Sequence, residues 1–197
     1  METWAVGMLL LGGWAFGQPV LDSNQDPSVE LVRWSSRQGS GRGESAELVI
    51  RASDRRLQAW VKLGKVDGCP DDVVLPSPPM GQGSRGFAPP RATVQVGSGP
   101  AREKNLRCGY FGWGALRFDY LGELESTVGW FLEHDQLRIT HPGRDGRGVV
   151  DVFDLRGLRE GLEEACKVLP SGCAHSGSPI GRILTSQDIW GRPPREP

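Results

Sequence analysis

The sequence lacks most of the features from which function is usually inferred. It has no charge bias, because 23 Lys+Arg and 24 Asp+Glu give a formal net charge of -1. A nearly neutral chain has no strong field to attract nucleic acid or an anionic membrane. It also lacks any C-x-x-C pair, and its histidines show no ligand spacing, which disfavours zinc. We expect no nucleic-acid partner, no cofactor and no metal ion.

The sequence also lacks an apolar run of the roughly 20 residues that cross a bilayer. The nearest candidate is residues 1–17, which read METWAVGMLLLGGWAFG. With the small residues Ala15 and Gly17 before a plausible cleavage point, this segment predicts a signal peptide removed after Gly17. It contains Glu2 and no lysine or arginine, so a buried first strand or helix is the open alternative. After removal of the signal we expect no membrane span.

Glycine and proline are abundant, at 28 and 15 of the 197 residues. This share is high for a globular domain but below that of disordered chains, so it predicts long and numerous loops. The richest stretch is residues 64–105. The chain length suits one domain with one core. We therefore expect a single β-rich domain over residues 18–175 and a C-terminal tail over residues 176–197.

Four cysteines lie after the predicted cleavage point, and an even number in an exported chain indicates disulfides. Three pairings are possible. The short loop between Cys166 and Cys173 could close locally, and Cys69 would then pair with Cys108. We prefer this pairing, and we expect a periplasmic or secreted protein.

Alternating apolar residues predict antiparallel strands. Leu48 and Ile50 are followed, beyond a polar turn, by Ala59 and Val61 in the same alternation, which predicts a hairpin. The glycines and the proline of residues 141–148 predict a turn between two adjacent strands. Further strands are expected at residues 29–34, 92–96, 115–120, 127–132, 136–140 and 149–153.

One helix is expected, over residues 155–168. Asp154 is suited to cap its N-terminus and Pro170 to end it. An apolar stripe on this helix would cover one face of the sheet. The predicted fold is therefore α+β, an antiparallel β-rich sheet or sandwich packed by one C-terminal helix. The stripe consists of Leu155, Leu158, Leu162, Ala165 and Leu169.

Two loop patterns resemble ligand sites without meeting their requirements. Residues 81–86 match G-x-G-x-x-G, but prolines flank them where a dinucleotide site needs a strand and a helix. Asp67, Asp71 and Asp72 surround Cys69 without the alternation of a calcium loop, so a solvated turn is the better interpretation.

Acid and base candidates are equally weak. His134 and Asp135 lack a nucleophile with a specified partner, and a polar connection between strands explains them better. Hydrolysis of a glycan needs two carboxyl groups roughly 5–10 Å apart across a cleft. Asp119, Glu123 and Glu125 are the clustered candidates for that role. We name no catalytic residue, and the balance favours a protein that is not an enzyme.

An aromatic cluster is the most interesting candidate for a binding surface. Tyr110, Phe111 and Trp113 are interleaved with glycines, and Trp130 follows in the chain. Such rings bind glycans or peptides when two or more are coplanar and solvated. They otherwise fill a core or cover a sheet edge.

Several segments resemble a known family. They are residues 48–51 (LVIR), 117–119 (RFD), 137–140 (LRIT) and above all 153–158 (FDLRGL), which is followed by a helix and a cysteine. In these the chain resembles the VasI or TagO-like periplasmic accessory proteins of bacterial type VI secretion, over about half its length.

The chain departs from that family in two places. Ala52 stands where the family has a cysteine, and residues 65–115 do not follow the family pattern, so no disulfide scheme carries over. The resemblance implies a non-enzymatic envelope protein that supports a larger assembly through a protein partner, with glycan as another possible ligand. The alternatives are a cell-wall-directed hydrolase and a secreted effector-associated protein.

Overall fold

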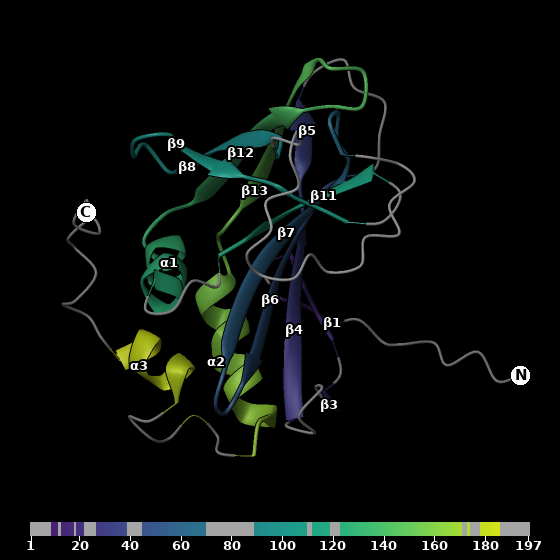
Figure 1. Cartoon of the computed structure of the whole chain (residues 1–197). Helices are drawn as coiled ribbons and strands as arrows, with labels where there is room; N and C mark the ends of the chain where they lie inside the picture. The colour runs from purple at the N-terminus through teal and green to yellow at the C-terminus, as the bar shows by residue number, and fades with distance from the viewer. Residues whose placement is uncertain are drawn as a thin grey trace, which may run out of the picture.

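The computed structural model describes residues 9–11, 13–17, 19–21, 27–38, 45–69, 89–109, 112–118, 123–170, 173 and 178–185. Strands dominate this part of the chain and form two antiparallel sheets (Figure 1). The expectation of a β-rich antiparallel fold is confirmed.

The first sheet has the strand order β1-β2-β4-β6-β7-β11-β10, and β3 also pairs with β4. Its long central strands β4, β6 and β7 run side by side (Figure 1). The strands of this sheet are β1 (Leu9–Leu11), β2 (Trp14–Phe16), β3 (Val20–Leu21), β4 (Pro27–Trp34), β6 (Glu47–Ser53), β7 (Leu57–Lys65), β10 (Arg107–Cys108) and β11 (Trp113–Arg117).

The second sheet has the order β5-β13-β12-β8-β9. Ser35 alone separates β4 from β5, so the chain passes here from the first sheet to the second. The strands of this sheet are β5 (Ser36–Gln38), β8 (Arg91–Val96), β9 (Arg102–Asn105), β12 (Gln136–Pro142) and β13 (Gly148–Asp154).

Both predicted hairpins are confirmed. Leu48 pairs with Val61 and Ile50 with Ala59 in the β6–β7 hairpin, and all four residues are buried. The turn within residues 141–148 joins β12 to β13, which pair along their full length. Alternation at a period of two located these strands because each has one face in the core.

The expectation of a single helix is wrong for the described residues, which form three helices: α1 (Glu123–Leu132), α2 (Leu158–Val168) and α3 (Pro179–Thr185). The predicted strand at residues 127–132 is the second half of α1. Val128 and Phe131, three positions apart, are fully buried, while Trp130 is only partly buried. This spacing places the two residues on one helix face.

The apolar stripe of the predicted C-terminal helix is confirmed, because all five of its members are buried. The start and the cap of the helix are wrong. Helix α2 begins at Leu158, behind Gly157 with φ at 81°, a left-handed conformation that glycine adopts at little cost. Asp154 instead accepts hydrogen bonds from the backbone and guanidinium of Arg156.

One hydrophobic core draws on both sheets and all three helices. Helix α2 contacts β2 and β4, α1 contacts β7, and the three helices contact one another (Figure 1). Ile180 and Ile183, which lie in the predicted tail, are buried in this core through α3. Within the described residues no helix is long and apolar enough to cross a membrane.

The preferred disulfide pairing is confirmed. Cys69, just beyond β7, is bonded to Cys108 of β10, with their Cα atoms 5.3 Å apart. Cys166 of α2 is bonded to Cys173, with a Cα separation of 5.1 Å.

The segment expected to be a signal peptide has described residues in the first sheet. Trp14 is fully buried, and its indole nitrogen donates to the carbonyl oxygen of Arg156 at 3.1 Å. This placement is what the alternative of a buried first strand requires. Removal of residues 1–17 during export stays a prediction.

Candidate functional site

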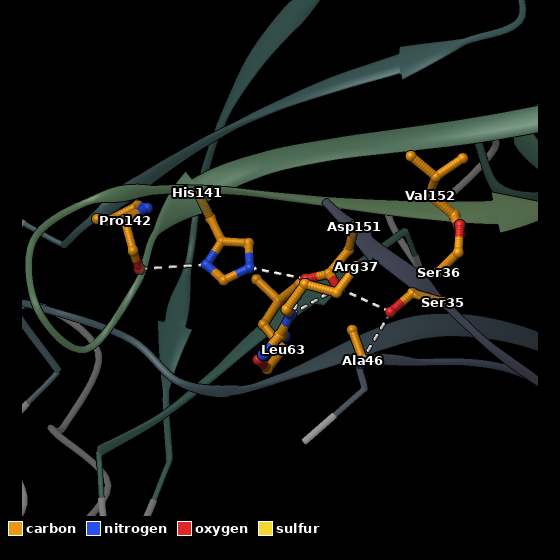
Figure 2. A network of polar contacts seen from close by, with 9 residues as sticks. All are labelled: Ser35, Ser36, Arg37, Ala46, Leu63, His141, Pro142, Asp151 and Val152. Carbon is orange, nitrogen blue, oxygen red and sulfur yellow. Dashed lines mark hydrogen bonds and ion pairs between the residues drawn. The ribbon is translucent and has the colours of Figure 1, made fainter. Parts of the chain in front are cut away.

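A buried polar network lies between the two sheets, centred on Asp151 of β13 (Figure 2). The Asp151 side chain is 0% exposed, and that of His141 on β12 is 1% exposed. Ser35, at the crossing between β4 and β5, and Arg37 of β5 complete the network. Asp151 and His141 are the most deeply buried ionisable residues of the part of the chain that the structure describes.

The strand pattern explains why these polar side chains point inward. On β12, His141 follows the buried Ile139 two positions later, and on β13 Asp151 lies between the buried Val149 and Phe153. Since alternate residues of a strand share a face, both polar groups occupy positions of the apolar stripe. No motif marks them, but a polar residue inside the apolar stripe of each of two adjacent strands is a sequence signal that could have found them.

Asp151 accepts four hydrogen bonds. Ser35 Oγ donates to Oδ1 at 2.7 Å, and Arg37 donates from Nε to Oδ1 at 3.0 Å and from Nη2 to Oδ2 at 3.1 Å. His141 Nε2 donates to Oδ2 at 2.9 Å. The arginine contact is bidentate, which is the strongest arrangement for a carboxylate and also fixes its orientation.

The network is bonded to the first sheet as well as to the second. Ser35 Oγ accepts a hydrogen bond from the backbone amide of Ala46 at 3.0 Å, just before β6. Arg37 Nη2 also donates to the carbonyl oxygen of Leu63 on β7 at 3.3 Å. The carboxylate of Asp151 therefore joins the two sheets through two side chains (Figure 2).

The electrostatic balance keeps Asp151 ionised. Burial raises the pKa of Asp151, but hydrogen bonds from His141, Arg37 and Ser35, together with the charge of Arg37, outweigh burial and hold that pKa below its ordinary value of 3.8. A buried charge is tolerable when it is paired and hydrogen-bonded, as it is here.

The network contains serine, histidine and aspartate, but it is not arranged as a hydrolytic triad. In a triad the histidine is bonded to the serine and the aspartate orients the histidine. Here Ser35 and His141 both bond to Asp151, and within the described residues no hydrogen bond joins Ser35 to His141. With both carboxylate oxygens occupied and the group buried, the arrangement is suited to holding the sheets together.

The predicted aromatic surface is only partly described. Tyr110 and Phe111 lie outside the described residues. Trp113 on β11 is 39% exposed, whereas Trp130 on α1 packs edge-to-face against His134, with 5.6 Å between ring centroids. Within the described residues no ring contact joins Trp113 to Trp130. A binding platform shared by the two rings therefore stays a prediction.

The other sequence candidates fall on connections or outside the described part. Residues 71–72, 81–86 and 119 lie outside it, and Glu123 and Glu125 belong to the start of α1. His134 Nδ1 contacts the carbonyl oxygen of Trp130 at 2.9 Å, and Asp135 is the last residue of the connection to β12. Within the described ranges no three histidine, cysteine or acidic side chains gather as a metal site.

A surface groove lies where the chain passes from β9 in the second sheet to β10 in the first. It encloses about 610 Å³. Glu103 is the acidic residue that lines it, and Arg91 pairs with Glu103 at 3.0 Å. The balance of charge in the groove is positive. Its other charged lining residues are Lys104, Arg107 and Arg117.

The chain matches no protein-family model, and no curated protein or solved structure is significantly similar to it.

Proposed function

We propose that this chain is an exported, non-catalytic protein that binds a protein partner in the envelope and supports the assembly of a secretion system. The observation that carries the proposal is the use of all four cysteines in two disulfides. Disulfides form and persist in oxidising compartments such as the periplasm or the outside of the cell. The assembly role comes from the family that the sequence resembles.

The motif that carries this resemblance has a structural role in the chain. Three buried side chains form the corner that joins the sheet to the helix: Phe153 near the end of β13, Leu155 in the connection, and Leu158 at the start of α2. These three side chains are apolar and buried, so the motif adds no catalytic group. This favours binding over the alternative of a cell-wall-directed hydrolase.

The groove between β9 and β10 is the binding surface that we propose for the partner. Its lining carries more positive than negative side chains, while the whole chain is nearly neutral. A local excess of one charge favours partners of the opposite charge and speeds their association. The partner segment should therefore be acidic.

Co-purification from the native envelope tests this function. The exported protein should recover components of the secretion apparatus. The variant Lys104→Glu/Arg107→Glu reverses two exposed charges of the groove and should recover much less. A matched variant, Arg144→Glu/Arg147→Glu, reverses two charges in the β12–β13 turn and should recover as much as the wild type.

Two results would contradict the proposal. One is equal recovery by wild type and groove variant at physiological salt. The other is release of soluble sugar from purified cell wall by the wild-type protein, which would establish the hydrolase alternative.

A further inference from the structure

The edge of β4 and the side of α2 form a groove that residues 14–17 fill. Trp14 and Ala15 are buried there to 0% and 2% exposure, although they belong to the segment predicted to be removed on export. Trp14 is among the largest fully buried side chains of the described residues. The folded core therefore contains residues that the predicted cleavage after Gly17 would remove.

The contacts of this segment are those of a regular antiparallel strand. Ala15 pairs with Val32 of β4, and Phe16 pairs with Leu31. The pairing continues through the amide of Gly17, which donates to the carbonyl oxygen of Glu30 at 3.0 Å. At the other end the Trp14 indole donates to the Arg156 carbonyl oxygen. The groove thus offers three things to a strand: the backbone groups of β4 for pairing, a pocket that holds the indole ring, and the Arg156 carbonyl oxygen as a hydrogen-bond acceptor at one end.

Removal of residues 1–17 would leave all three parts of the groove without their present partner. Part of the β4 edge would lose its partner, the carbonyl of Arg156 would lose its donor, and a space the size of an indole would open beside α2. An unpaired strand edge next to an apolar pocket is a surface to which an extended peptide adds as a further strand.

The helix cannot simply move inward to close this space. Gly161 of α2 already lies against Leu31 of β4, since a Cβ placed at Gly161 would come within 3.3 Å of the leucine side chain. Helix and strand are therefore in contact beside the pocket. The disulfide between Cys166 and Cys173 and the packing of Leu162 in the core hold the same helix in place.

We propose that this groove is a strand-binding site, filled by residues 14–17 until the signal segment is removed, which then accepts an extended segment of the partner protein. The proposal rests on the proposed function and names how that partner is held. The contacts define the segment. It runs antiparallel to β4 and has an aromatic residue with a ring N–H donor where Trp14 lies. A small residue follows at the place of Ala15, because that position is closed to solvent.

A peptide-binding experiment tests this site on the protein as it leaves the cell. The intact mass of the exported protein first establishes whether residues 1–17 have been removed. The processed protein is then titrated with a synthetic peptide of residues 9–17 carrying terminal lysines for solubility. The matched control is the unprocessed chain with both disulfides formed, in which Trp14 occupies the groove.

The processed protein should bind the peptide with micromolar affinity, and the unprocessed chain should not. A peptide with Trp14→Ala should bind at least about 100-fold more weakly, because loss of a buried tryptophan is among the costliest truncations. A peptide with Gly17→Pro should also bind more weakly, because proline lacks the N–H that bonds to Glu30.

Three results would overturn the proposal: no peptide binding by the processed protein, equal binding by the unprocessed chain, or affinity unaffected by Trp14→Ala. Retention of residues 14–17 in the exported protein would overturn it too, since the segment would then be a permanent strand. None of these results bears on co-purification through the β9–β10 groove, so failure of this site and failure of the proposed function are distinguishable.

Discussion

Asp151 is the residue at which the polar contacts between the two sheets converge. Replacing it by asparagine keeps the shape of the side chain but leaves the charge of Arg37 without a counterion, although the arginine side chain is only 15% exposed. Breaking a buried ion pair by removing one partner costs about 3–5 kcal/mol. We expect Asp151→Asn to lower the free energy of unfolding by about 3 kcal/mol, measured by urea denaturation.

Asp154 provides the matched control, because it lies on the same strand and receives the same substitution. Hydrogen bonds from Arg156 hold the pKa of Asp154 below its ordinary value, and Arg33 adds an ion pair at 3.1 Å. These contacts lie nearer the surface, where ion pairs contribute about 0–1 kcal/mol. Asp154→Asn should therefore cost less than about 1 kcal/mol. Equal losses of unfolding free energy in the two variants would show that the buried network stabilises the fold no more than the contacts near the surface.

The lowered pKa of Asp151 also predicts the direction of acid unfolding. Because the folded state holds this carboxyl ionised, its contribution to stability is complete above the ordinary value of 3.8. It is lost as the pH falls from that value through the lower folded pKa. The free energy of unfolding should therefore drop more steeply below pH 3.8 in the wild type than in Asp151→Asn. Parallel curves for the two proteins would contradict this assignment.

Single residues were the hardest level to predict from sequence. The cysteine pairs could be predicted because a short loop favours local closure. Asp151 and His141 could not be found by motif, because Ser35 and Arg37, the other partners of Asp151, lie 116 and 114 positions earlier in the chain. Only knowledge of which strands are neighbours brings these residues together.

Helix α1 stands where alternation predicts a strand, and its packing can be tested directly. Phe131 is fully buried and meets Phe118 edge-to-face, with 5.5 Å between ring centroids. We expect Phe131→Ala to cost about 3–5 kcal/mol of unfolding free energy, as for other buried aromatic residues. The exposed Glu133, just past the helix, should tolerate alanine within about 0.5 kcal/mol. A small loss for Phe131→Ala would argue against this helix packing.

The elements that sequence predicted correctly are those with an unambiguous period. The hairpins β6–β7 and β12–β13 each turn one face toward the core and have turn residues between their strands. In α1 the apolar Val128, Trp130 and Leu132 alternate as in a strand, while Val128 and Phe131 have helical spacing. A segment this short fits both periods, and only the burial of Phe131 in the core decides between them.

The two disulfides act on the whole molecule, because they restrict the unfolded chain. Cys69 and Cys108 are 39 positions apart, and Cys166 and Cys173 are 7 apart. From loop-closure entropy the longer loop should contribute about 4 kcal/mol and the shorter about 2.5 kcal/mol. We expect Cys69→Ser/Cys108→Ser to destabilise the protein more than Cys166→Ser/Cys173→Ser in urea denaturation. The reverse order would indicate that the short disulfide restrains α2 beyond its effect on the unfolded chain.

The distance along the chain between Ser35 and Asp151 sets the order in which the molecule can form. They are 116 positions apart, and the hydrogen bond between them joins the early strands to one of the last. Contacts between such distant segments form slowly, because a long loop must close first. A nascent chain that ends before β13 lacks the Asp151 carboxylate, although every strand of its first sheet is already present. The polar join between the sheets therefore closes last, when most of the polypeptide has already been synthesised.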